Sequence, residues 1–481
     1  MTIISKQLPV IFKFCLIMVT ICIIMAGCKT TQPGMQTQEV SKTTNQAISN
    51  KALKEYAEKA EPLIEEITGR KYDKSKTEYK IVTREELRKV MMEEELPGAL
   101  KMGQGMGEDI IKRQLETSTQ SRSQNYIARY SNMKDILYII PENIKPVSSF
   151  IEVKDEDLND FIFMVIAHDM VHCLDDQYYD FMKLIGKCDG REQVTALGAV
   201  IDGSAAYVTK EIAKRLNIPE RTYVNATKSS LTIKDETSGA GKEYYDLYFT
   251  KGASFIKAII DKKGLEGFNM VFMSPPVSSR QIYYPEEYLN PPAITGIDCK
   301  KLLETIKDKL PTEGARSNIN TLGTSTLQSA LVTQGVDKAE AGELAERLLN
   351  GITFTAIKPA IKPSILSLEI LNFKNGEDAQ KYYSFLKKMQ DASQNQIKAQ
   401  LNTSFDIIKD EELKQDGFNL LKYNEIKIKA QNDEAITKKM TAIIDSTSVV
   451  IGYVNMNDQT MQDLLNIMNL IYSEQHKLKQ I

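Results

Sequence analysis

An apolar run that ends in two histidines constrains the fold of this chain more than any other feature. Residues 161–167 are all apolar, and His168 and His172 follow them. Side chains four residues apart lie on the same face of an α-helix, so the two imidazoles can hold one metal ion. The apolar run predicts a buried helix, in which each imidazole needs a polar partner. A shared cation is one such partner, and the hydrogen-bonding groups of an ordinary protein core are the alternative.

Histidine is scarce in this chain, which makes the spacing informative. The 481 residues contain three histidines, and the third is His476. Random placement would give about 0.02 pairs four residues apart. The spacing therefore favours a metal site, although two histidines without a glutamate between them are a weak signature and simple packing stays open.

A catalytic zinc site usually has three protein ligands and one open position. Asp202 is a candidate third ligand, because it is the one carboxylate within the small and apolar stretch 196–206. Small residues allow two helices to approach closely, and a buried carboxylate needs a cation or a donor. A partly exposed carboxylate is the alternative. Asp176, four residues after His172, is either a hydrogen-bond acceptor for an imidazole N–H or a carboxylate on the helix surface.

The first 28 residues have the pattern of an export signal. Lysines precede an apolar run, Phe14–Met25, that is too short for a typical membrane-spanning helix. The run leads into Ala26-Gly27-Cys28, which resembles the lipobox of bacterial lipoproteins and implies a lipid on Cys28. An ordinary signal peptide is the alternative. Residues 29–50 are rich in Thr, Gln, Ser and Asn and predict a flexible tether, so we expect a protein of the cell envelope, facing the periplasm or the exterior.

Composition narrows the function further. The net charge is −3, and no long basic run follows the signal segment, so we do not expect nucleic-acid binding. After export, Cys173, Cys188 and Cys299 remain beside Cys28. Three cysteines allow at most one internal disulfide, and the sequence does not select a pair.

Hydrophobic periodicity predicts helices mixed with a few strands, an α+β protein of two domains. The Asn290-Pro291-Pro292 stretch predicts a boundary between a domain at 51–295 and a smaller α+β or α/β domain at 296–481. In the first domain we expect helices at 51–68, from 83 and over 191–216, either a polar helix or a mobile segment over 104–124, strands at 79–82 and 136–140, and a long helix carrying both histidines. In the second we expect helices at 299–309, 324–349, 377–389 and 460–475 and strands at 365–371, 424–430 and 448–454.

Three segments resemble exported zincin-type metallopeptidases, distantly similar to thermolysin-type gluzincins. That group carries H-E-L-x-H-x-L-Q-D-Q-H-F-D-L, then A-L-x-E-G-x-A, then P-P-x-S-T-x-Q-x-L-H-P-E-x-Y. This chain has HDMVHCLDDQYYDF at 168–181, ALGAVIDGSAAYV at 196–208 and PPVSSRQIYYPEEYL at 275–289. The resemblance implies a zincin-like domain at 51–295 with Zn²⁺ bound by His168, His172 and Asp202.

The chain departs from this pattern at three chemically central positions. Asp169 replaces the glutamate that acts as general base, and it is shorter by one methylene group. Asp202 replaces a glutamate ligand, and Tyr284 stands where the group has a histidine. A tyrosine hydroxyl can donate a hydrogen bond to an oxyanion but carries no positive charge at neutral pH.

Three hypotheses follow from these residues. The first is a lipid-anchored zinc metallopeptidase that hydrolyses peptides or proteins outside the cytoplasm, with Asp169 as base and Tyr284 as oxyanion donor. The second is an inactive pseudo-peptidase that binds a peptide or protein partner, because a misplacement of about 1 Å can reduce a rate about 100-fold. The third is a purely structural envelope protein whose histidines pack in the core without binding a metal.

Overall fold

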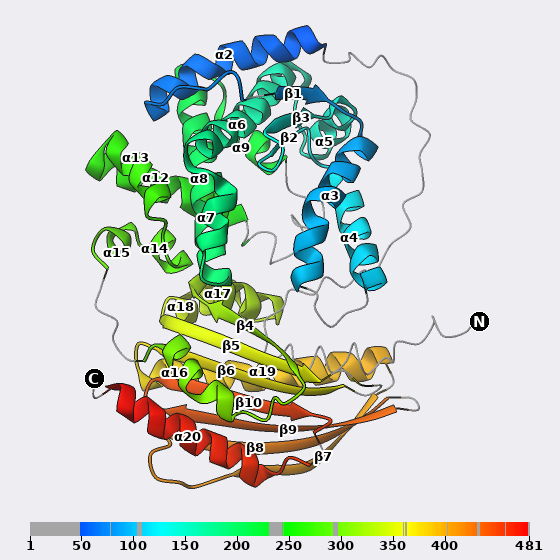
Figure 1. Cartoon of the computed structure of the whole chain (residues 1–481), viewed down its shortest axis with the longest axis vertical. Helices are drawn as coiled ribbons and strands as arrows, with labels where there is room; N and C mark the ends of the chain where they lie inside the picture. The colour runs from blue at the N-terminus through cyan, green and yellow to red at the C-terminus, as the bar shows by residue number, and fades with distance from the viewer. Residues whose placement is uncertain are drawn as a thin grey trace, which may run out of the picture. The chain divides into compact units, whose positions relative to one another are not determined.

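The computed structural model describes residues 49–76, 78–102, 108–229, 243, 245–291, 297–358, 360, 363–401, 403–430, 433–456 and 458–479. The predicted signal segment, Cys28 and most of the predicted tether lie outside these residues. The described chain forms two compact units (Figure 1). The N-terminal unit extends to Asp189 and resumes over Gln193–Leu289, and the C-terminal unit comprises Gly190–Glu192 and the chain from Asn290 onward. None of the described helices combines the length and apolarity that crossing a membrane requires.

The N-terminal unit is mostly helical and contains one small sheet. Its elements are α2 (Asn50–Thr68), β1 (Glu78–Ile81), α3 (Arg84–Met102), α4 (Glu108–Ser123), β2 (Ala128–Ser131), β3 (Ile136–Ile139), η2 (Pro141–Asn143), α5 (Ile144–Phe150), η3 (Asp155–Asp157), α6 (Leu158–Tyr179), α7 (Phe181–Lys187), α8 (Arg191–Arg215), α9 (Glu220–Lys228), η4 (Asp246–Lys251), α12 (Gly252–Lys263), α13 (Leu265–Met273), α14 (Ser279–Tyr283) and α15 (Pro285–Leu289).

The small sheet has the order β1-β3-β2, with β1 parallel and β2 antiparallel to β3. Strand β2 therefore lies at one edge and packs beside α6. The buried face of α6 shares one core with α2, α8 and α12, to which Phe161, Ile64, Val200 and Phe255 contribute. This core fixes α6, the helix that carries both histidines.

The C-terminal unit is a sheet between two layers of helices (Figure 1). Its sheet has the order β4-β5-β6-β10-β9-β8-β7, and every neighbouring pair is antiparallel. The unit is therefore α+β, not α/β. Its elements are α16 (Cys299–Ile306), η5 (Lys307–Lys309), β4 (Arg316–Leu322), α17 (Thr324–Thr333), α18 (Lys338–Ala345), β5 (Leu348–Lys358), β6 (Ser364–Phe373), α19 (Gly376–Leu401), β7 (Thr403–Glu412), β8 (Leu420–Ala430), β9 (Asp433–Ile444), β10 (Thr447–Val454) and α20 (Met461–Lys479).

Alternation along the strands explains the two helical layers. In β6, Leu366, Leu368 and Ile370 face α16 and α20, while Leu371 and Phe373 face α17, α18 and α19. Such a strand is buried on both faces, so its polar and apolar residues do not alternate strictly, and its short apolar runs are what mark it as a strand in the sequence.

The α+β class is confirmed, and one predicted element is wrong. The expected single helix over 324–349 is two helices, α17 and α18, followed by the start of β5. Gly335 between the helices has a positive φ of 89°, a conformation that ends a helix. Asp337 then caps α18 by accepting the backbone N–H groups of Ala339 and Glu340.

Candidate metal centre

Helix α6 presents both histidines from a buried position. Its residues 161–167 are all buried, as their composition predicts. The helix ends at Asp180, which adopts the left-handed conformation with φ of 53° and donates its N–H to the Asp176 carbonyl. The Asp180 side chain also accepts the Lys183 N–H and so starts α7. Local sequence signals therefore set both the burial and the length of this helix.

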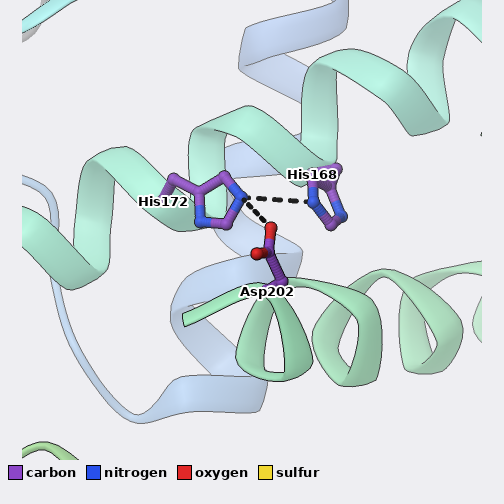
Figure 2. A group of neighbouring side chains, drawn as sticks. All are labelled: His168, His172 and Asp202. Atoms are coloured by element: carbon purple, nitrogen blue, oxygen red, sulfur yellow. Dashed lines mark hydrogen bonds and ion pairs between the residues drawn. The ribbon is translucent and has the colours of Figure 1, made fainter. Parts of the chain in front are cut away.

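His168, His172 and Asp202 lie together (Figure 2). One ligand atom of each lies within 4.8 Å of the others. The two Nε2 atoms are 3.2 Å apart, and Nε2 of His172 is 3.6 Å from Oδ1 of Asp202. Two nitrogen ligands of a tetrahedral zinc ion are separated by about 3.3–3.4 Å, given metal–nitrogen bonds of about 2.0–2.1 Å. The described residues could therefore hold one metal ion between α6 and α8.

The group remains accessible from outside the core. The side chain of His172 is 14% exposed and that of Asp202 is 23% exposed. The ring of His168 also lies 5.8 Å from the ring of the buried Phe249. An ion or a water molecule can reach the exposed part of this group, while Phe249 is an apolar neighbour of His168.

Burial sets the charge state of the ligands. It lowers the pKa of His172 to about 4, and it holds the pKa of His168 well below the ordinary value, with a smaller contribution from His172. Both imidazoles are therefore neutral at pH 7, as metal ligation requires. Burial raises the pKa of Asp202 to about 7, and the negative charge of Asp169 adds to this. A cation between these groups would compensate for their desolvation.

Asp169 lies close enough to Asp202 to influence its ionisation, but one of its oxygens is already engaged. Oδ1 of Asp169 accepts the backbone N–H of Tyr130 on the edge strand β2, at 3.0 Å. Burial raises the pKa of Asp169 to about 6, although this hydrogen bond and the charge of Arg129 lower it. Asp169 is thus mainly ionised at pH 7 and can accept a proton, and its second oxygen is the one that remains for this role.

Asp176 does not act as the imidazole acceptor proposed from the sequence. Its carboxylate accepts the Tyr130 hydroxyl at 3.0 Å and the Phe181 N–H at 2.6 Å. The Nδ1 atoms of both histidines are buried and lack a hydrogen-bond partner among the described residues. Asp176 therefore links α6 to β2 and α7. The spacing of four residues was correct for one helical face, but Tyr130 and Phe181 compete for the carboxylate.

Tyr284 follows α14, and its ring lies 4.7 Å from the guanidinium carbon of Arg280. Arg280 in turn forms two hydrogen bonds with Glu287, at 2.5 and 2.7 Å. The structure thus shows a cation–π contact for Tyr284, and its role as an oxyanion donor stays a prediction.

Sequence reasoning missed two contacts that position α8, one with α6 and one with α12. The first is Asp175, which accepts hydrogen bonds from Arg70 and from Ser204 on α8. The second is the close approach of α8 to α12, where a Cβ on Gly203 would lie 2.4 Å from the backbone carbonyl carbon of Gly252. The glycine next to Asp202 was a visible signal for such an approach, whereas nothing local indicated the partner of Asp175.

Comparison with known proteins gives one distant structural likeness. No protein-family model matches the chain, and neither does any curated protein sequence. A solved structure from Chloroflexus aurantiacus, titled as "a putative hydrolase with a novel fold", aligns with a TM-score of 0.40 and 16% identity. The alignment covers 52% of this chain and 91% of that one. The zincin resemblance therefore rests on the three sequence motifs, and the site is interpreted from its own geometry.

Proposed function

We propose that this protein is a zinc-dependent hydrolase of the peptidase type, with His168, His172 and Asp202 as the metal ligands. The observation that carries the proposal is the spacing of their ligand atoms, 3.2 and 3.6 Å, which is close to the edges of a zinc tetrahedron. Among the described residues three protein ligands come together, which leaves a fourth position, and the 23% exposure of Asp202 leaves access to it. An open position supports a catalytic role in this proposal, since structural zinc sites normally close all four positions.

The chemistry of such a site divides between the ion and the protein. Zinc supplies a Lewis acid that polarises the substrate carbonyl. Asp169, ionised at pH 7, accepts a proton from the attacking water through the oxygen that Tyr130 does not occupy. The Tyr284 hydroxyl donates to the developing oxyanion in this proposal. The substrate is a peptide or protein outside the cytoplasm, and nucleic acid is not a partner.

Hydrolysis of a quenched fluorescent peptide library by the zinc-loaded full chain tests this proposal. We expect slow cleavage that a chelator abolishes and that Asp169→Ala reduces at least about 100-fold, the usual effect of losing a general base. Asp160→Ala is the matched control, because it removes a carboxylate from the first turn of the same helix. Cleavage that persists in Asp169→Ala would exclude Asp169 as the base.

A second candidate function is a pseudo-peptidase that binds a peptide or protein without cleaving it. The hydrogen bond from Tyr130 to Asp169 favours it, because it draws a shortened carboxylate toward β2. For this candidate we expect zinc binding without turnover in the natural chain. Replacement of both Asp169 and Asp202 by Glu restores the longer side chains, and cleavage by that variant alone would identify the two substitutions as the cause of inactivity.

We also propose that a lipid on Cys28 anchors the protein in a bacterial cell envelope. Support comes from the order of basic, apolar and small residues before Cys28. Metabolic labelling with a fatty-acid analogue tests this. We expect labelled, membrane-associated protein from the natural chain and unlabelled protein from Cys28→Ser, and equal labelling of the two would contradict the proposal.

A further inference from the structure

Asp175 joins three segments of the N-terminal unit through one buried carboxylate. Its Oδ1 accepts a hydrogen bond from Nη2 of Arg70 at 2.5 Å, and its Oδ2 accepts one from Oγ of Ser204 at 2.6 Å. Asp175 and Ser204 are fully buried and Arg70 is 4% exposed. Asp175 lies on α6 three residues after His172, and Ser204 lies on α8 two residues after Asp202. The carboxylate thus connects the helix that carries two ligands to the helix that carries the third.

Arg70 is itself held in place. It follows α2, and its guanidinium carbon lies 4.8 Å from the ring centre of Phe268 on α13 and 5.2 Å from that of Tyr179 at the end of α6. The two rings hold the Arg70 guanidinium, and the hydrogen bonds from Arg70 and Ser204 in turn restrict the Asp175 carboxylate. Buried ion pairs of this kind are a poor source of net stability, but they can select one arrangement of the elements they join.

The ligand set makes the spacing of α6 and α8 important. An aspartate reaches less far than a glutamate, so Asp202 can contact an ion held by His168 and His172 only if α8 stays close to α6. On its other side α8 is pressed against Gly252, where a Cβ on Gly203 would not fit. The Ser204–Asp175 hydrogen bond is a polar contact that fixes α8 to α6 near the ligands.

We propose that Asp175 is a positioning residue for the metal centre: held by Arg70, it fixes α8 through Ser204 at the distance at which Asp202 completes the ligand set. This inference rests on the metal binding proposed above. It assigns Asp175 no contact with the ion. It accounts for a buried charge on α6 that neither the ligand set nor the general base uses.

Zinc affinity and cobalt spectra of the full chain test the inference. Ser204→Ala removes the hydroxyl that reaches α6, while Thr209→Val is the control, because the buried Thr209 hydroxyl donates to the Ala205 and Ala206 carbonyls of its own helix. We expect Ser204→Ala to weaken zinc binding about 10–100-fold, the usual effect of losing a group that orients a ligand. We also expect an altered visible spectrum of the Co²⁺-loaded protein, and neither change in Thr209→Val.

A paired variant keeps the test valid if charge removal prevents folding. Arg70→Met alone leaves the Asp175 charge unpaired in the core, whereas Arg70→Met combined with Asp175→Asn removes both charges and keeps an oxygen for Ser204. We expect the double variant to bind zinc within about 10-fold of the natural chain. Equal affinity and equal cobalt spectra for Ser204→Ala and Thr209→Val would overturn the positioning role while leaving the metal site intact. A natural chain that binds no zinc would overturn the metal site and this inference together.

Discussion

Two carboxyl groups, the partly buried Asp202 in the N-terminal unit and the buried Glu369 in the C-terminal unit, show how different surroundings give similar ionisation. Burial raises the pKa of Asp202 to about 7 and that of Glu369 to about 8. Glu369, on β6, accepts the Tyr382 hydroxyl at 2.7 Å, and the charge of Lys439 also favours its ionised form. Asp202 instead faces a neutral imidazole nitrogen at 3.6 Å and the like charge of Asp169.

The difference indicates what each carboxyl is suited to. Glu369 is mostly protonated at pH 7 and accepts a hydrogen bond from Tyr382, so it is satisfied within the protein core without a cation. Asp202 lies beside two imidazole nitrogens, which can donate electron pairs to a cation as its own carboxylate can. Of these two carboxyl groups, Asp202 is therefore the one suited to a metal ion.

The largest expected effect is a difference in zinc content between variants of the histidines in the two units. We expect His168→Ala to lose essentially all bound zinc, because the remaining His172 and Asp202 no longer form a three-ligand set. His476→Ala is the control, since Nδ1 of His476 bonds to the Tyr472 carbonyl on α20. Metal content by mass spectrometry should be about one zinc per chain in the control. Equal zinc in both variants would place the metal elsewhere.

A bulkier residue beside Asp202 should disturb the N-terminal unit. We expect Gly203→Ala to lower the free energy of unfolding by about 2–4 kcal/mol, because its Cβ would collide with the Gly252 backbone, which cannot move aside as a side chain can. Gly186→Ala on α7 is the control, since a Cβ there has no neighbour within 4 Å, and it should be neutral or stabilising. Denaturant unfolding of both variants checks this. If Gly203→Ala changes the free energy of unfolding no more than Gly186→Ala does, α8 can shift to accommodate the added Cβ.

Glu369 should make the C-terminal unit less stable as the pH rises. Its pKa in the folded protein, about 8, lies above the ordinary 4.5, so the folded state binds the proton more tightly than the unfolded state. Its contribution to stability is complete below pH 4.5 and is lost as the pH rises through 8. We expect Glu369→Gln to remove this decline. At pH 9 the free energy of unfolding of the variant should be about 1–4 kcal/mol higher than that of the natural chain. Denaturant unfolding of both proteins at pH 5 and pH 9 measures this. If the free energy of unfolding changes by the same amount between the two pH values in both proteins, the expected ionisation of Glu369 is contradicted.

Asp202 should give zinc binding a pH dependence that the histidines do not. Metal binding requires the ionised carboxylate, and at pH 6 a group with a pKa of about 7 is mostly protonated. We expect affinity to fall about 10-fold for each pH unit below 7, since one proton must leave. His172, with a pKa of about 4, contributes only near that pH. Competition with a chromophoric chelator from pH 5.5 to 8 measures the slope, and a flat profile would show that Asp202 is not a ligand.

The sequence alone specified the parts of the site that depend on local spacing. The apolar run before His168 predicted a buried helix, and the four-residue interval placed both imidazoles on one face, as α6 shows. Small residues around Asp202 indicated a close helix approach, although the glycine beside it meets Gly252 rather than α6. The sequence pattern also predicted β1, β3, β6, β8 and β10, because short runs of apolar and β-branched residues bounded by turn residues are typical of strands.

Only the tertiary structure decided which distant groups meet. The backbone N–H of Tyr130 binds Asp169 across 39 residues, and Arg70 reaches Asp175 across 105. These partners come from β2 and from the segment after α2, and no local pattern relates them to α6. Strands β2, β4, β5, β7 and β9 went unpredicted because their residues become strand-like through pairing within their sheets. The sequence thus determined which groups can bind a metal, through spacing within a helix, while the packing of α8 and β2 against α6 determined how close the remaining groups come.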